Sequence, residues 1–354
     1  MTPFSWYSST TAQLRPYRRF PKVELHRHLE GSLRIETLLE IAHTYGITLP
    51  IEPELRSMVQ MQRSDSLTFS TFLSKFKMLR LFYCSPEVIA RVTREAVADA
   101  AEDGVLHLEL RFTPVALTRV QDFGLGDVMD WVLESARQAS LDHEISVRLI
   151  VSVNRHESVA LAEKVAALAV DRKDKGIVGM DLAGNEADFQ AEPFAGLFHQ
   201  VKAAGLKVSI HAGEWAGAAN VREAIERIGA DRVAHGVRVM EDPSAVALAR
   251  ERQIPFEVCV TSNYQSGVVQ SLSAHPLVKM MEAGLYVTIN TDDPSISQIT
   301  LSDEYRQAVE NLGLSQAQLV ERVCAAAQAA FLPAVEKQKL LERLHDQLHQ
   351  ERLE

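Results

Sequence analysis

The sequence has few cysteines, and this limits the classes of protein to which it can belong. Its 354 residues include only three, Cys84, Cys259 and Cys324, which lie far apart. An odd number of isolated cysteines is typical neither of a disulfide framework nor of a CxxC zinc or redox pair. We therefore expect reduced thiols in a cytoplasmic protein.

Long hydrophobic runs and basic blocks are also missing. No segment approaches the roughly 20 consecutive apolar residues of a membrane-spanning helix, and residues 1–20 lack the apolar region of a secretory signal. The formal net charge is −10, and no Lys/Arg block that could follow a phosphate backbone is present. We therefore expect neither a membrane nor a nucleic-acid polymer as partner, and a small neutral or cationic ligand fits better.

Eight short apolar segments predict β-strands. They cover residues 21–28, 104–112, 145–153, 176–184, 206–214, 231–237, 254–263 and 285–293. Several are apolar almost throughout, as in strands that are covered on both faces. Between them, apolar residues recur at three- and four-residue spacing and predict helices over 158–174, 193–204, 221–229, 243–252 and 275–284.

Eight strands that alternate with helices predict an α/β protein, specifically a (β/α)₈ TIM-type barrel. The alternative is an open doubly wound sheet, but no GxGxxG follows the first strand. Additional helices are expected after strand 1, within 29–103, and at the C-terminus, within 301–354. No linker or repeat divides the chain, so we expect an N-terminal arm over 1–20 and a single domain over 21–354.

Four metal-binding side chains fall at the C-terminal ends of predicted strands, where barrel enzymes build their active sites. His26 and His28 lie two residues apart on the first strand and so point to the same side. His211 ends the fifth strand and Asp292 the eighth. Taken singly, each has an ordinary structural explanation, such as a core histidine or a helix cap. Together, three imidazoles and one carboxylate predict one bound Zn²⁺ with room for a water molecule.

Three further polar residues lie at the same predicted edge of the barrel. Glu214 follows His211 by three residues and is a candidate general acid or base, or else a carboxylate at a helix start. His235 ends the sixth strand, where it contributes to the site or bonds to the backbone. Asp293 either binds substrate or caps a helix. Neighbouring carboxylates with different partners often divide roles within a site.

These residues stand in motifs that resemble the adenosine deaminase family of amidohydrolase-type barrels. The motifs are PKVELHRHLEGSLR, DLAGNE, HAGE, RVAHG, CVTSN and NTDDP, in that order, between about residues 21 and 330. The resemblance implies a metal-dependent hydrolase that replaces the exocyclic amino group of an adenine-type purine with oxygen and releases ammonia. Adenosine or 2′-deoxyadenosine is the substrate that it favours, with inosine or deoxyinosine as product.

The resemblance also implies a role for each residue. The four residues named above would hold one zinc ion. Glu214 would protonate the ring nitrogen beside the reacting carbon, and His235 would orient the attacking water and stabilise the oxyanion-like intermediate. Asp293 would bond to a nitrogen of the five-membered ring, and the backbone of Gly184 would contact the six-membered ring.

The part of the pocket that would hold the ribose is less clearly defined. His28 and Glu30 would border the substrate, and the HLEG motif replaces the HLDG that is frequent among adenosine deaminases. HLEG is common in relatives that act on free adenine, whereas TSNYQSG and NTDDP look more like the nucleoside branch. Free adenine and a 5′-modified adenosine such as aminodeoxyfutalosine therefore remain alternatives.

Phenylalanines recur at helical spacing within 67–82. The resemblance makes Phe72 and Phe76 part of an apolar lid over the substrate, whereas periodicity alone fits a stripe that faces the core equally well.

Two other kinds of protein would be expected to differ from this sequence at defined positions. A metal-binding barrel that no longer catalyses and serves as a regulator would lack Glu214 or a metal ligand, and all are present. A phosphotriesterase or dihydroorotase would carry a metal-bridging lysine after strand four. Here that strand ends in DLAG, which favours a single metal ion.

Overall fold

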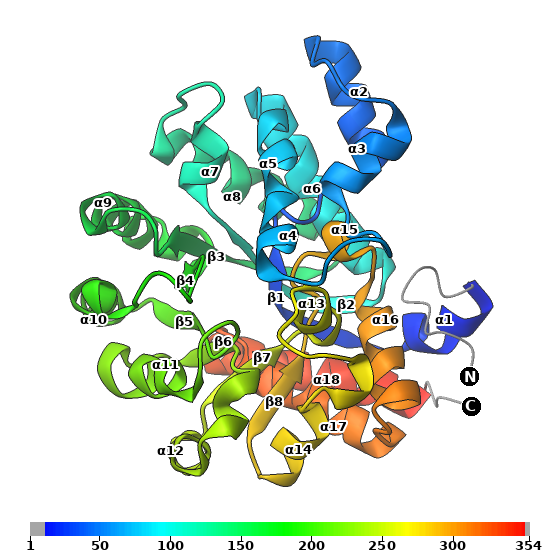
Figure 1. Ribbon diagram of the computed structural model, residues 1–354, viewed down its shortest axis with the longest axis vertical. Helices are drawn as coiled ribbons and strands as arrows, with labels where there is room; N and C mark the ends of the chain where they lie inside the picture. Colours follow the sequence, from blue (N-terminus) through cyan, green and yellow to red (C-terminus); the bar gives the residue numbers. More distant parts are fainter. Residues whose placement is uncertain (1–10, 351–354) are drawn as a thin grey trace.

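The computed structural model describes residues 11–350, and in them eight parallel strands form one sheet in the order of the chain (Figure 1). The strands are β1 (Lys22–His28), β2 (Val105–Phe112), β3 (Ser146–Asn154), β4 (Ile177–Ala183), β5 (Lys207–Ala212), β6 (Arg232–His235), β7 (Pro255–Val258) and β8 (Tyr286–Ile289). Helices surround the strands in a ring. The predicted TIM-type barrel is confirmed.

The barrel closes between its first and last strands through the segment that follows β8. The amide N–H of His28 donates to the carbonyl oxygen of Asp292 at 2.8 Å, and the amide of Asp292 donates to the carbonyl of His26 at 2.9 Å. Arg27 and Asp292 form the parallel bridge between these segments. The point of closure is therefore the position at which a metal ligand was predicted.

The apolar runs of the sequence form the layer between strands and helices. All eight residues of β2 are buried, as expected for a strand that is covered by helices outside and by side chains within the barrel. The barrel interior also contains charged side chains, among them Glu109, Arg111, Arg232 and Glu257, each with no exposed surface. These charges pair with one another beneath the C-terminal ends of the strands.

Capping residues mark the starts of several outer helices. Ser85 accepts a hydrogen bond from the amide of Val88 at the start of α6, and Ser158 caps α9 through Leu161. The helices of the outer ring are α6 (Pro86–Glu102), α8 (Leu125–Asp142), α9 (Val159–Val170), α10 (Ala195–Ala203), α11 (Ala218–Glu223) with the π-helical η4 (Ala224–Ile228), α12 (Pro243–Glu251), α14 (Leu277–Glu282) and α17 (Gln316–Ala329).

Additional helices lie after strand 1 and at the C-terminus, as predicted. The first crossover contains α2 (Ile35–Tyr45), α3 (Glu52–Val59), α4 (Phe69–Ser74), α5 (Phe76–Leu79) and η1 (Arg80–Phe82). Beyond β8 lie α15 (Pro294–Ser297), α16 (Leu301–Arg306), η7 (Gln307–Asn311) and α18 (Ala334–Gln350). The remaining helices are α1 (Thr11–Arg19), α7 (Pro114–Thr118), η2 (Lys173–Lys175), η3 (Glu192–Phe194), η5 (Val237–Glu241), α13 (Val260–Gln265) and η6 (Leu272–Ala274). Among residues 11–350, no helix combines the length and the apolar character needed to cross a membrane.

The predicted strand over 254–263 is too long. It ends at Val258, and α13 begins at Val260. The carboxylate of Glu304 accepts hydrogen bonds from the amides of Val260 and Thr261, the first residues of α13. Glu304 thus caps the start of a helix in a segment that begins with β-branched residues. The residue pattern within 254–263 gives no sign of this distant contact.

Candidate active site

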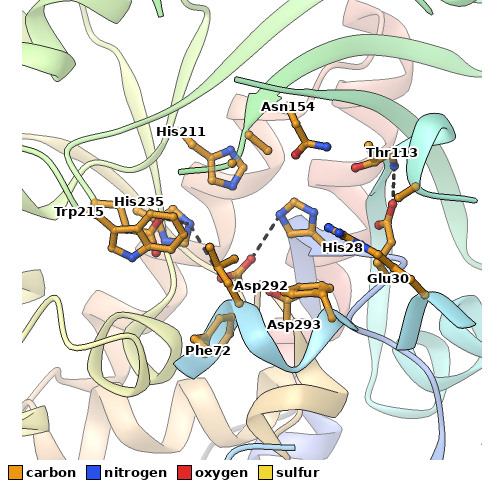
Figure 2. Close-up of a pocket in the computed structure, with 17 residues that line it drawn as sticks. His28, Glu30, Phe72, Thr113, Asn154, His211, Trp215, His235, Asp292 and Asp293 are labelled. Carbon is orange, nitrogen blue, oxygen red and sulfur yellow. Dashed lines mark hydrogen bonds and ion pairs between the residues drawn. The ribbon is translucent and has the colours of Figure 1, made fainter. Parts of the chain in front are cut away.

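Four imidazoles and one carboxylate converge at the C-terminal ends of β1, β5 and β6. Figure 2 shows four of these five side chains, those of His28, His211, His235 and Asp292. His26, His211, His235 and Asp292 each offer a ligand atom, and these atoms lie within 4.8 Å of one another. His28 belongs to the same group, because its Nε2 is 3.4 Å from Oδ1 of Asp292. The structure thus brings the four predicted ligands together and adds His235 to them.

Two of the imidazoles are oriented by carboxylates behind them. His26 Nδ1 lies 2.9 Å from Oε2 of Glu257, and His211 Nδ1 lies 2.9 Å from Oδ1 of Asp181. Metal-bound histidines typically donate their second ring N–H to such an acceptor, which leaves the other nitrogen free for the ion. The donor set and its supporting carboxylates therefore fit a divalent cation such as zinc.

Electrostatics favour the ionised carboxylate in this cluster. Burial by itself would raise the pKa of Asp292, but the contact with His26 and the other surrounding imidazoles hold that pKa well below its usual range. Burial lowers the pKa of His28 and His235 well below the ordinary value. An anionic carboxylate beside the neutral imidazoles of His28 and His235 is a protonation state that suits a metal site.

Glu214 occupies a buried position next to this cluster. Its carboxylate Oε2 is 3.7 Å from Nε2 of His235. Burial, and then the negative charges of Asp292 and Glu186, raise the pKa of Glu214 well above its usual range. A carboxyl group with a raised pKa at such a position is suited to act as a general acid.

The loop that carries Glu214 is held in place by Glu186. The two carboxylate oxygens of Glu186 accept hydrogen bonds from the amides of four successive residues, at distances between 2.6 and 3.2 Å. Those residues are Gly213, Glu214, Trp215 and Ala216. The DLAGNE motif, to which Glu186 belongs, thereby fixes the backbone of the HAGE motif.

A second pair of buried acids lies on the other side of the cluster. Burial, together with the charges of Asp292 and Glu30, raises the pKa of Asp293 well above its usual range, and its Oδ1 has no hydrogen-bond partner among the described residues. Glu30 accepts a hydrogen bond from the amide of Thr113 at 2.6 Å. Gly31 permits this arrangement, because a Cβ atom at that position would overlap the Asp293 carboxylate.

These side chains open into a pocket with an empty volume of about 660 Å³. Phe72 and Phe76 line it, so the helical segment after strand 1 contributes to the pocket as well as to the core. Gly184 also lines it with a φ of 93°, which favours glycine. Figure 2 shows Phe72 and Trp215 beside Asp292, with Glu30 on the far side of His28.

Comparison with known proteins identifies the family. The family model for adenosine deaminase matches residues 21–347. The chain belongs to the adenosine deaminase family. It is 36% identical over 327 residues to the adenosine deaminase of Klebsiella pneumoniae strain 342, which covers 92% of this chain and 97% of that one. As a member of this family the protein is a hydrolytic purine deaminase that acts on a carbon–nitrogen bond.

Solved structures of related proteins superpose closely on this one. An adenine deaminase from Arthrobacter aurescens aligns with a TM-score of 0.86 and 28% identity over 93% of this chain and 99% of its own. An amidohydrolase from Burkholderia ambifaria with bound zinc aligns with a TM-score of 0.86 and 25% identity, over 99% and 97%. The ADAL protein of Arabidopsis in complex with IMP aligns with a TM-score of 0.85 and 26% identity, over 95% and 99%.

Two of the site residues in this family member adopt strained backbone conformations. His235 has a φ of 58° and Asp292 a φ of 73°, values that residues other than glycine rarely adopt. Such strain costs about 1–3 kcal/mol for each residue and persists only where the surroundings enforce it. At Asp292 the enforcement comes from the two backbone hydrogen bonds to β1.

The sequence analysis assigned no role to the residues behind the cluster. Asp181 and Glu257 orient His211 and His26, and both lie within predicted strands that are otherwise largely apolar. A charged residue within a largely apolar strand indicates a buried carboxylate that needs a partner, and this was the signal in the sequence that could have identified both residues. Glu257 receives hydrogen bonds from Arg111 at 2.7 Å and from Arg232 at 2.6 Å.

Proposed function

We propose that this deaminase converts adenosine and 2′-deoxyadenosine to inosine and deoxyinosine, with one zinc ion held by His26, His28, His211 and Asp292. The observation that carries the proposal is the position of buried Glu214, whose Oε2 lies 3.7 Å from Nε2 of His235 in the imidazole–carboxylate cluster. The similarity to an adenosine deaminase at 36% identity supports the nucleoside over the free base.

The side chains divide the work of this reaction among them. A zinc ion in the cluster would activate a water molecule as the nucleophile. Glu214 donates a proton to the purine ring nitrogen beside the reacting carbon, which makes that carbon more electrophilic. Asp293 and the backbone of Gly184 orient the purine. Addition of water and loss of the amino group as ammonia leave inosine.

The general acid is tested with Glu214→Gln. A positioned acid contributes about 10²–10⁴-fold, so kcat for adenosine should fall at least about 100-fold while bound zinc stays unchanged. Glu226→Gln is the control, because Glu226 is exposed on η4 and the same change there should leave kcat unaltered. Deamination is followed by the change in near-ultraviolet absorbance, and full activity of Glu214→Gln would exclude this role.

The ligand set is tested by metal analysis of three variants. His28→Ala and Asp292→Ala should lower bound zinc, whereas His235→Ala should retain it. Full zinc occupancy in His28→Ala, together with loss of zinc from His235→Ala, would show that His235 and not His28 is the metal ligand.

A second candidate substrate is an adenosine with an anionic 5′ substituent. Arg80 is the one lysine or arginine among the residues that line the pocket in the described chain, and its Nε has no hydrogen-bond partner there. An unpaired guanidinium is suited to a phosphate or carboxylate group. The complex of the related ADAL protein with IMP agrees with a nucleotide in such a pocket.

Substrate competition separates the two candidates. If adenosine is the substrate, its kcat/KM should exceed those of AMP, adenosine 5′-carboxylate and adenine. If the 5′ anion is recognised, Arg80→Gln should lower kcat/KM for AMP or the carboxylate at least about tenfold and leave adenosine unchanged, since a charge-assisted pair contributes roughly 1.5–3 kcal/mol. Lys77→Gln is the control, because Lys77 is an exposed residue of the neighbouring α5.

A further inference from the structure

Three buried polar side chains form a line that ends in the active site. His275 follows η6, Asn263 belongs to α13 and His235 ends β6. Their exposed fractions are 5%, 0% and 1%. Hydrogen bonds link His275 to Asn263 and Asn263 to His235, which belongs to the imidazole–carboxylate cluster. Once the donor and acceptor are known at His275, they are known for both bonds.

The direction is set by a backbone amide. The N–H of Leu277 donates to Nδ1 of His275 at 3.1 Å, and because an amide N–H is only a donor, this ring nitrogen is the acceptor. Burial lowers the pKa of His275 to about 3, so the ring is neutral. Its proton is therefore on Nε2, which donates to Oδ1 of Asn263 at 3.2 Å.

The orientation of Asn263 then determines the tautomer of His235. With Oδ1 of Asn263 turned toward His275, its Nδ2 amide group donates to Nδ1 of His235 at 3.1 Å. A neutral imidazole that accepts at Nδ1 carries its proton at Nε2. That atom faces two carboxylate oxygens, Oε2 of Glu214 at 3.7 Å and Oδ2 of Asp292 at 3.9 Å.

We propose that Asn263 and His275 are positioning residues that hold His235 in its Nε2–H tautomer. His235 is then a hydrogen-bond donor at the site, and neither a metal ligand nor a base. His26 and His211 have the opposite polarity, since each directs Nδ1 to a carboxylate and keeps the Nε2 lone pair for an ion. The five-member cluster therefore contains imidazoles of two kinds, which proximity alone does not distinguish.

This polarity has a use in the reaction, and that part of the inference rests on the proposed function. As water adds to the purine carbon, the attacking oxygen lies among several carboxylates and needs a fixed donor to keep its orientation. A donor that is already oriented stabilises the transition state without rearrangement. The wrong tautomer would present a lone pair instead, and in other hydrolases such a reversal lowers kcat by about 10⁴.

The tautomer is measured directly by ¹⁵N NMR of the holoenzyme labelled at its 12 histidines. The His235 signals are identified by their loss in His235→Gln. The expected result is a proton on Nε2 and an unprotonated Nδ1. A proton on Nδ1 would overturn the proposal without reference to any substrate, so its failure is separate from failure of the proposed function.

The nearly isosteric change Asn263→Asp reverses the final bond of the line. The new carboxylate accepts from His235, so the proton should appear on Nδ1 and kcat should fall at least about 100-fold with little change in KM. An unchanged His235 spectrum in the folded variant would contradict the proposal.

Two variants at His275 separate the hydrogen bond from mere packing. His275→Gln retains an N–H donor toward Asn263, whereas His275→Met fills a similar volume without one. The proposal expects the wild-type tautomer and nearly wild-type kcat in His275→Gln, and a mixed tautomer with lower kcat in His275→Met. Equal tautomers in both would show that His275 does not set the direction.

Discussion

The interaction of Glu186 with the HAGE loop allows a quantitative prediction. Its carboxylate accepts four backbone hydrogen bonds and is buried, with 3% of its surface exposed. Glu186→Gln keeps the shape of the side chain but replaces one oxygen by an NH₂ group. In either orientation of the new amide, its NH₂ group faces at least one backbone N–H. Because both groups are donors, they form no hydrogen bond with each other.

The expected loss follows from the number of bonds. Hydrogen bonds to charged groups contribute about 1.5–3 kcal/mol each, and neutral ones about 0.5–1.5 kcal/mol. In its better orientation the amide oxygen keeps three neutral bonds, and the amide of Gly213 loses its acceptor. We therefore expect the free energy of unfolding to fall by at least about 2 kcal/mol. Because the same bonds position Glu214, and a displacement of about 1 Å can cost 10²-fold, kcat should fall about 100-fold.

Denaturant unfolding and steady-state kinetics measure both quantities. Glu192→Gln serves as the control, because Glu192 is an exposed carboxylate on η3, and surface changes usually stay within about 0.5 kcal/mol. If the free energy of unfolding of Glu186→Gln stays within about 0.5 kcal/mol of the wild-type value and its kcat is unchanged, Glu186 does not hold the loop.

Three further predictions concern other buried contacts of the site and its surroundings. Burial raises the pKa of Glu304 to about 8, so between pH 4.5 and 8 this side chain is protonated in the folded state and ionised in the unfolded state. The free energy of unfolding of the wild type should therefore fall as pH rises from 5 to 8. Denaturant titrations at each pH should show a smaller fall for Glu304→Gln. Gly31→Ala should displace Asp293 and lower kcat/KM for adenosine at least about tenfold, with zinc content unchanged, and wild-type kinetics would show that the extra methyl group fits. Asp181→Asn replaces the charged acceptor behind His211 with a neutral amide and should weaken zinc binding about 10–100-fold in chelator competition, whereas unchanged affinity would show that the carboxylate charge does not matter to the metal.

The sequence predicted the barrel well because the signals for it are local. Apolar runs of strand length, separated by helices, mark each βα unit wherever it lies in the chain. Side chains at strand ends then follow from topology, which is why His26, His28, His211 and Asp292 meet as predicted. Neither inference required knowledge of contacts between distant residues.

The features that were missed depend on contacts between distant residues. The end of β7 is set by Glu304, which lies 44 residues beyond Val260, the first of the two amides that it caps. The polarity of His235 is set by His275 through Asn263, and the loop around Glu214 by Glu186 from the preceding βα unit. A motif shows that such residues are present, but their pairing emerges only once the barrel has formed.

The way in which the barrel closes also has a consequence for protein synthesis. Asp292 joins the first strand to the last through its backbone, and the same residue directs its carboxylate at His26 from 266 positions away. Contacts between residues so far apart carry the largest loop-closure entropy and form late in folding. In a chain still emerging from the ribosome, the ligand cluster is therefore incomplete until Asp292 has been synthesised and has paired with β1. Assembly of the cluster that could hold an ion and closure of the barrel therefore become one event.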